Sequence, residues 1–360
     1  MRSELDKILN DITPLCKDAM DKASLYQARL AKPPGSLGRL ENLSIQLAGI
    51  TGKVYNSIEK KHLLVFAADN GVVEEGVSSA PQSVTLKQAV NLTKEKTGAA
   101  VLAAHFGCNI TVCDVGINGD VTDSGVIDKK IAYGTQNIAK GPAMTEEQAI
   151  KAIMTGIEIA KNTDADILGV GEMGIGNTTT ASAVLSVLLD TYIEKVTGRG
   201  GGLTDTAFQK KKQVIERAIK INRPNKKDVT DVLSKVGGFD IAAMCGAFLG
   251  AAASKKPVVI DGFISVAAAL CAARLCPDSV NYMIASHNSF EIGYVLAINE
   301  LGLAPMLDLD MRLGEGSGCP LAFQIVDAAC SIINKMATFE DADINDNYLE
   351  EIRQGDKFTP

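Results

Sequence analysis

The chain has 360 residues, a formal net charge of −7 and a hydrophobic fraction of 46%, which suggests about two domains around a large core. The excess of acid excludes a nucleic-acid-binding surface, which needs clustered Lys and Arg, and charges interrupt the longest apolar stretch, so no membrane span is expected. Eight cysteines without a Cys-x-x-Cys pair and three isolated histidines argue against a zinc or iron–sulfur site, so no metal and no cofactor are expected.

The first and last predicted elements are helical. Residues 5–30 and 327–352 are rich in Leu, Ile, Ala, Lys and Glu with helical periodicity. The paired prolines Pro33 and Pro34 end the first region because proline cannot continue a helix. We expect the two ends to pack together as a small, mainly helical domain of residues 1–59 and 327–360, with residues 358–360 as a frayed tail.

Residues 60–326 contain six short apolar runs of the kind that form buried strands. In chain order, these runs begin at His62, Asn109, Asp166, Val258, Val280 and Ala304. Most are followed by alanine-rich segments with helical spacing. Such alternation predicts βαβ units and a mostly parallel sheet covered by helices on both faces, in one large α/β catalytic domain.

Five of these runs lead into an acid that is followed closely by glycine. The acids are Asp69, Asp114, Glu172, Asp261 and Glu315, and the remaining run ends at Ser286-His287-Asn288-Ser289. Ligands of such sheets bind beyond the carboxyl ends of the strands, so these acids and glycines are expected to line one crevice. The alternative is that the glycines only form turns and the acids only cap helices. For Asp69 and Asp114 both interpretations stand equally.

Two glycine-rich segments predict an anion-binding cradle. Residues 174–180 (GIGNTTT) begin a predicted helix and offer free N–H groups, hydroxyls and the positive end of the helix dipole. Residues 198–205 (GRGGGLTD) precede a second helix that carries Lys210, Lys211 and Lys212. One of these lysines, with Lys211 as the candidate, is expected to reach back toward a phosphate, and the others to be solvated.

Gly169-Val-Gly171-Glu-Met-Gly174 also matches the dinucleotide-binding fingerprint. That motif requires an acid at the end of a second strand about 20 residues on. Asp190 has roughly this spacing, but it ends a segment that is typical of a helix. A nicotinamide-dependent oxidoreductase therefore remains an alternative, as does a non-catalytic nucleotide sensor.

Glu172 and Glu315 are the candidate catalytic acids. Two acids in one crevice can take different roles because burial and mutual repulsion separate their pKa values. Glu172 could instead cap the helix that begins near Thr178. For Glu315 no helix is expected immediately afterwards, and the glycines on either side would let a ligand approach its carboxylate closely. We therefore expect Glu315 to be a general base.

Together, these segments resemble the nicotinate-nucleotide:dimethylbenzimidazole phosphoribosyltransferases, which make α-ribazole phosphate for the lower ligand of cobalamin. The resemblance spans nearly the whole chain. It is carried by residues 33–41 (PPGSLGRLE), 66–78 (FAADNGVVEEGVS), 171–180 (GEMGIGNTTT), 198–204 (GRGGGLT) and 311–318 (MRLGEGSG).

The resemblance implies a Rossmann-like doubly wound domain, a small domain formed by both termini, and a homodimer. It places Glu315 at the catalytic glutamate position and Glu172 at a second acidic position. The residues implied to border the nucleotide are Gly174, Gly176, Asn177, Thr178, Gly201, Gly202, Asp261, Gly262, Ser289 and Gly314. Those implied to border the base are Ser79, Gln88, Met311 and Leu313.

The expected substrates are nicotinate mononucleotide and a benzimidazole base. The leaving nicotinate is already a pyridinium, so cleavage of the C1′–N bond needs neither a metal nor a general acid. The attacking benzimidazole becomes cationic, and Glu315 would accept the proton from its other nitrogen. Attack opposite the leaving group would invert C1′ and give α-ribazole 5′-phosphate. The natural acceptor could also be another base or a phenolic compound.

The location expected from the sequence is the cytoplasm. Most of the eight cysteines lie in apolar runs, where cysteine is a small core residue, and so many unpaired thiols fit a reducing compartment. The N-terminal residues contain no apolar segment of the kind found in secretory signals.

Overall fold

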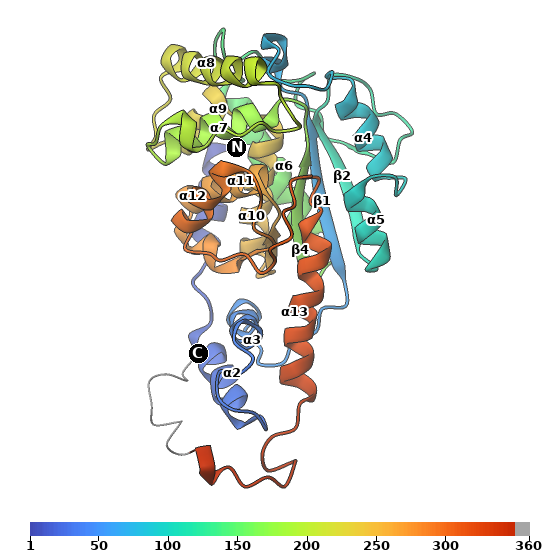
Figure 1. Ribbon diagram of the computed structural model, residues 1–360, viewed down its shortest axis with the longest axis vertical. Helices are drawn as coiled ribbons and strands as arrows, with labels where there is room; N and C mark the ends of the chain where they lie inside the picture. Colours follow the sequence, from blue (N-terminus) through green and yellow to red (C-terminus); the bar gives the residue numbers. More distant parts are fainter. Residues whose placement is uncertain (350–360) are drawn as a thin grey trace.

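The sheet is organised around β1 (Lys61–Ala68), whose apolar side chains are buried on both faces. Leu64 and Phe66 enter one hydrophobic core together with residues of α6 (Glu146–Asn162) and α10 (Phe239–Ala253). Leu63 and Val65 enter another with residues of α5 (Gly98–His105) and α13 (Gly318–Lys335). Successive side chains of a strand point to opposite faces, so an uninterrupted apolar run requires cover on both. This is the reason for the three-layer arrangement of the computed structural model, which describes residues 1–349 (Figure 1).

The described residues form a six-stranded sheet in which every pairing is parallel. The strand order is β3-β2-β1-β4-β5-β6. The other strands are β2 (Asn109–Gly116), β3 (Ile127–Asp128), β4 (Ile167–Met173), β5 (Val258–Ile260) and β6 (Met283–Ala285). Successive strands are added outward from β1 in one direction and then in the other, which confirms the Rossmann-like doubly wound fold. The carboxyl ends of β1 and β4 lie side by side where the order reverses.

Helices cover the two faces of the sheet unequally (Figure 1). One face carries α6 (Glu146–Asn162), α7 (Asn177–Leu188), α9 (Val229–Val236), α10 (Phe239–Ala253) and α11 (Phe263–Leu275). Beyond them lie α8 (Asp205–Asn222) and α12 (Ile292–Glu300). The other face carries α4 (Val84–Leu92), α5 (Gly98–His105) and the first part of α13 (Gly318–Lys335). Short 3₁₀ helices occupy Gly71–Glu75, Ile193–Lys195, Pro277–Tyr282 and Asn347–Leu349.

Two of the predicted strands differ from the structure. The apolar run that begins at Ala304 forms no strand but a loop with one isolated bridge, between Leu307 and His287. Its residues 308–310 are exposed, so the run lacks the continuous burial of an inner strand. The run that begins at Val280 is a strand only from Met283, because Pro277 starts a 3₁₀ helix before it. The edge strand β3 is only two residues long, and both residues are exposed. The sequence therefore contained no apolar run from which this strand could be predicted.

A small helical unit lies beside the sheet. It consists of α2 (Lys17–Arg29), α3 (Arg39–Thr51) and the far end of α13, which share a core of Ala19, Ala23, Ala48 and Ile333. Figure 1 shows α13 running from the sheet down to these helices. The first helix, α1 (Arg2–Asp11), packs instead against α6 and α10 of the large domain.

The C-terminal helical region differs from its expected bounds. Helix α13 begins at Gly318 and ends at Lys335, so it crosses the predicted boundary at residue 326 without a break, and most of residues 336–349 are irregular. The predicted tail at residues 358–360 lies outside the described residues. The division into 60–326 and 1–59 plus 327–360 stays a prediction. Within residues 1–349, no helix combines the length and apolarity needed to cross a membrane.

Candidate active site

A cavity of about 200 Å³ opens at the carboxyl ends of the central strands. Its walls come from the ends of β4 and β5, the first turn of α7, the loop after β6 and the loop before α13. Most of the predicted site residues meet here. Those that line the cavity are Ser79, Glu172, Gly174, Gly176, Asn177, Thr178, Gly201, Asp261, Gly262, Ser289, Leu313, Gly314 and Glu315.

Glu315 sits in a turn whose backbone is left-handed at three successive residues. The φ angles of Gly314, Glu315 and Gly316 are 82°, 61° and 83°. Only glycine adopts this region freely, so the two glycines allow the turn and Glu315 carries its strain. The turn rests directly on β4, since a Cβ added to Gly171 would lie 2.5 Å from Gly316 Cα. Such a close backbone approach fixes the position of Glu315 relative to the sheet.

The Glu315 carboxylate is held by groups from α4 and α5, which lie on the same face of the sheet as the start of α13. Its Oε1 accepts a hydrogen bond from Gln88 Nε2 at 3.3 Å, and its Oε2 accepts one from the backbone N–H of Ala99 at 3.3 Å. Ala99 lies in the first turn of α5, which Thr97 caps. The positive end of this helix stabilises negative charge on Glu315. Gln88, predicted to border the base, thus meets the carboxylate without lining the cavity.

Glu172 is the second acid of the cavity and is almost completely buried. Asn177 Nδ2 donates to its Oε2, and the backbone N–H of Glu315 approaches its Oε1 at 3.4 Å. The same Asn177 nitrogen donates to Asp240 Oδ2 at 3.1 Å. Burial and the charge of Asp240 raise the pKa of Glu172 to about 8, and burial raises the pKa of Asp240 to about 6. Of the two acids, Glu172 therefore holds a proton more strongly than Asp240 does.

Asp261 organises the start of α13. Its carboxylate accepts the N–H groups of Gly316, at 3.0 Å, and Gly318, at 2.7 Å, and lies 3.8 Å from His287 Nδ1. The expectation that no helix follows Glu315 immediately is thus wrong, because α13 begins three residues later. Burial raises the pKa of Asp261, and the backbone donors and His287 oppose this shift. The residue reaches the cavity, but its hydrogen bonds fix the Glu315 turn.

The other side of the cavity suits an anion. The turn from Gly174 to Asn177 presents the N-terminus of α7, and Lys211 of α8 lies behind Thr178 with no exposed surface. Lys211 Nζ donates to Thr178 Oγ1 at 2.9 Å and to the Gly198 carbonyl at 3.0 Å. Burial lowers the pKa of Lys211 to about 8, and the nearby Glu291 opposes this shift.

Three predictions about neighbouring residues can be compared with this arrangement. Lys212 lies over the Phe208 ring at 4.4 Å, away from the cavity, and Lys210 is exposed. Gly202 is exposed and does not line the cavity. Met311 is also outside the lining, and its carbonyl accepts the N–H of Phe290 at 3.1 Å.

The sequence interpretation missed several residues that belong to the site. Glu291, Arg312 and His287 line the cavity, and Asp240 lies beneath it. Arg312 is adjacent to Leu313, which was predicted to border the base, and His287 belongs to the polar segment that follows β6. Both residues could therefore have been predicted from their positions in the sequence. Asp240 could not, because an acid in the first turn of a helix is usually explained by the helix dipole.

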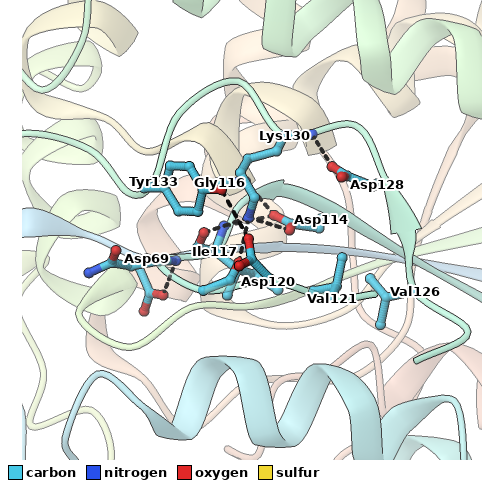
Figure 2. Close-up of polar contacts among 12 residues, drawn as sticks. Asp69, Asp114, Gly116, Ile117, Asp120, Val121, Val126, Asp128, Lys130 and Tyr133 are labelled. Carbon is cyan, nitrogen blue, oxygen red and sulfur yellow. Dashed lines mark hydrogen bonds and ion pairs between the residues drawn. The ribbon is translucent and has the colours of Figure 1, made fainter. Parts of the chain in front are cut away.

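Asp69, which follows β1, and Asp114, which lies near the end of β2, stabilise loops instead of lining the cavity. Figure 2 shows Lys130 directed at Asp114, whose Oδ2 lies 2.5 Å from Lys130 Nζ. The ammonium also donates to the carbonyls of Ile117 and Gly119, at 2.6 and 2.9 Å. Asp69 Oδ2 accepts the N–H of Asn118 at 2.8 Å. These contacts favour the structural interpretation of both acids.

The dinucleotide fingerprint is not formed. Gly169 and Gly171 lie inside β4 instead of in a turn after it. A Cβ on Gly169 would lie 2.6 Å from Cys319 Cβ, so this glycine accommodates α13. Asp190, the candidate ribose ligand, is exposed and paired with Lys226 at 2.7 Å. The glycine spacing therefore reflects packing and gives no support to an oxidoreductase.

Among residues 1–349, no cluster of three or more His, Cys, Asp or Glu side chains has an arrangement that could hold a metal ion. All eight cysteines lie in this part of the chain, and none forms a disulfide there.

Comparisons with known proteins agree with one another. A family model described as phosphoribosyltransferase matches residues 12–344. The chain is 53% identical to the nicotinate-nucleotide–dimethylbenzimidazole phosphoribosyltransferase of Clostridium perfringens (strain ATCC 13124), over 97% of this chain and 98% of that protein. It is 48% identical to the protein of the same name from Clostridium tetani, with the same coverage. The crystal structure of CobT from Thermus thermophilus superposes with a TM-score of 0.88 at 37% identity, covering 92% of this chain and 100% of that one.

Proposed function

Because the chain belongs to the nicotinate-nucleotide–dimethylbenzimidazole phosphoribosyltransferase family, we propose that Glu315 is the general base of phosphoribosyl transfer in this cavity. The chain transfers the ribose 5-phosphate of nicotinate mononucleotide to 5,6-dimethylbenzimidazole, a step of cobalamin synthesis. The products are nicotinate and α-ribazole 5′-phosphate. The observation that carries the proposal is the position of the Glu315 carboxylate, held at the cavity between Gln88 and the start of α5.

The two sides of the cavity suit the two charges of the nucleotide. The phosphate binds at the first turn of α7, where the N–H groups after Gly174, the Thr178 hydroxyl and Lys211 provide donors and positive charge. The pyridinium extends from the phosphate toward Asp261, and the Glu315 side of the cavity is left for the incoming base. Carboxylates near the anomeric carbon favour the positive charge that develops there during cleavage.

The acceptor base binds against Leu313 and Ser79. One ring nitrogen attacks C1′ from the face opposite to nicotinate, and the C1′–N bond to the pyridinium breaks, so the configuration at C1′ inverts. The other nitrogen loses its proton to Glu315, which removes the positive charge gained by the ring. Fixing the ribose between the cradle and the base allows in-line attack. Gly201, Gly262, Ser289 and Gly314, which line the cavity, are assigned to the nucleotide. Gly202, Gln88 and Met311 lie outside the lining, so the contact of Gly202 with the nucleotide and those of Gln88 and Met311 with the base stay predictions.

The assay that tests this function is incubation of the chain with nicotinate mononucleotide and dimethylbenzimidazole, followed by chromatography. Nicotinate and α-ribazole phosphate are expected in equal amounts, and none without the base. If the nucleotide stays intact in the presence of the base, the proposed function fails. A competition among benzimidazole, a purine and a phenol at one nucleotide concentration ranks the alternative acceptors.

The expected assembly and location are parts of the same proposal. Phe290, Ile292, Val295 and Leu296 are exposed apolar side chains on and before α12, and we assign this surface to a homodimer. Sedimentation of the purified chain is expected to give twice the monomer mass. The free thiols fit a cytoplasmic enzyme.

A further inference from the structure

Asn177 binds two buried acids at once. Its Nδ2 donates to Glu172 Oε2 and to Asp240 Oδ2. An amide nitrogen carries two hydrogens, so one points at each acid and both facing oxygens act as acceptors. Glu172 lines the cavity, whereas Asp240 lies beneath it with no exposed surface, at the start of α10. The mechanism above uses neither Asp240 nor a proton on Glu172.

The hydrogen bonds favour one position for a proton in this pair, the oxygen with the longest contact. Two ionised carboxylates so close in a buried site repel each other, so the pair retains a proton. Asp240 Oδ1 accepts the N–H of Ile241 at 3.0 Å, so both oxygens of Asp240 act as acceptors. Glu172 Oε1 has only the 3.4 Å contact from the N–H of Glu315. It lies next to the cavity-lining Gly314, where a Cβ would be 2.6 Å away. The proton therefore belongs on Glu172 Oε1.

We propose that Asp240 is a positioning residue that holds Asn177 in place and whose negative charge keeps Glu172 protonated, so that Glu172 donates a hydrogen bond to an oxygen of the bound nucleotide. The inference rests on the proposed function, which places the nucleotide in this cavity. A neutral acid suits this position because the nucleotide is an anion, and its oxygens would be repelled by an ionised Glu172.

Burial and the charged groups around Glu172 favour the neutral acid. The charged groups that act on it are Asp240 from α10 and Asp261 at the end of β5, and both are acids. The hydrogen bonds from Asn177 and from the backbone N–H of Glu315 oppose this effect, but the raised pKa shows that they are outweighed. The pKa of Glu172, raised to about 8, exceeds that of Asp240, raised to about 6, which agrees with the hydrogen bonds on where the proton resides.

The test is the pH dependence of kcat with saturating nucleotide, for the full chain and three variants. Lys211 also has a pKa of about 8, so its titration could be confused with that of Glu172. Saturating nucleotide removes this ambiguity, because the bound phosphate keeps Lys211 protonated. In the parent chain kcat is expected to fall above about pH 8, as Glu172 loses its proton. Glu172→Gln keeps a neutral donor and is expected to retain most of kcat without this fall. Asp240→Asn removes the charge that raises the pKa of Glu172, so kcat is expected to fall at a lower pH than in the parent chain. The double variant Glu172→Gln/Asp240→Asn is expected to show no fall of kcat in this range.

The matched control is Asp69→Asn. Asp69 is another buried acid at a strand end, and asparagine still accepts the hydrogen bond from Asn118. In this variant the fall of kcat is expected at the parent pH. The inference is overturned if kcat of Glu172→Gln still falls at the same pH as kcat of the parent chain. It is also overturned if Asp240→Asn lowers kcat by the same factor at every pH. Nicotinate release by the parent chain keeps these failures distinct from failure of the proposed function.

A second measurement needs no folded Asp240 variant. Infrared difference spectra between the parent chain and Glu172→Gln at pH 7 are expected to contain the carbonyl stretch of a neutral carboxylic acid. A carboxylate stretch in its place would show that Glu172 is ionised and would overturn the inference.

Discussion

At the scale of single residues, Glu315 shows how backbone geometry determines the chemistry. The neighbouring glycines permit a left-handed turn, and the turn directs the carboxylate at the cavity instead of at solvent. From the glycines the sequence predicted only that a ligand could approach this carboxylate closely, and not the left-handed turn. It could not show that Gln88 and the first turn of α5 hold the carboxylate, because these partners are more than 200 residues away in the chain.

The first prediction concerns the general base. Glu315→Gln keeps the size and the hydrogen-bond acceptor but cannot take a proton, so kcat is expected to fall about 10²- to 10⁴-fold. The Kd values of both substrates, measured by calorimetry, are expected to change little. Near-normal turnover in this variant would remove Glu315 from its assigned role.

The second prediction concerns the close contact between Gly171 of β4 and the turn that carries Glu315. In Gly171→Ala the new methyl group would lie 2.5 Å from Gly316 Cα, so the turn must move away from β4. Overpacking of this kind costs about 1–3 kcal/mol, and a lower Tm with a loss of kcat is expected. Gly141→Ala is the control, since no atom lies within 4 Å of its added methyl group and both values should stay unchanged. A fully active Gly171→Ala would contradict the close contact.

At the scale of elements, predictions succeeded where burial was continuous. The runs that became β1, β2, β4 and β5 are apolar because both faces of the sheet are covered, and their order in the chain revealed the alternation with helices. The run that begins at Ala304 was wrongly predicted as a strand. Its apolar residues belong to a loop, and composition cannot distinguish an apolar loop from a short strand. Which lysine of α8 points toward the start of α7 depended on helix phase, and in the structure Lys211 is the one whose Nζ contacts Thr178.

The third prediction uses this face of α8. Lys211→Met keeps the length of the side chain but removes a charged donor of the anion cradle. Such hydrogen bonds are worth about 1.5–3 kcal/mol, so the KM for nicotinate mononucleotide is expected to rise roughly 10- to 100-fold, with little change in the KM for the base. Lys210→Met, one position earlier and exposed, should leave both KM values unchanged. Equal effects of the two variants would contradict the assignment.

At the scale of the whole molecule, the small helical unit is joined to the site. Arg39 of α3 donates from Nη2 to the Ala304 carbonyl at 2.5 Å and from Nη1 to the Pro305 carbonyl. These residues begin the loop that leads to Glu315. The sequence predicted that the ends of the chain meet, but it could not predict that α1 packs against the large domain, since that depends on side chains of α6 and α10.

The fourth prediction concerns the ion pair that secures this unit. Lys32 Nζ lies 2.7 Å from Glu41 Oε1 and both side chains are buried, so removal of one partner leaves an uncompensated charge. Glu41→Gln is expected to cost about 3–5 kcal/mol and to lower Tm clearly. The apolar double variant Lys32→Met/Glu41→Leu should recover much of this loss. Asp18→Asn, which breaks the exposed pair with Lys22, should leave Tm unchanged. A Tm of Glu41→Gln equal to that of the parent would refute the burial argument.

The most direct measurement for the assignment of Glu315 is a crystal structure of the chain with 5,6-dimethylbenzimidazole bound. The proposed mechanism predicts that the protonated ring nitrogen lies within hydrogen-bond distance of the Glu315 carboxylate, with the other nitrogen facing the nucleotide cradle at the start of α7. A ring nitrogen that instead donates to Glu172, or a base bound away from the Glu315 turn, would contradict it.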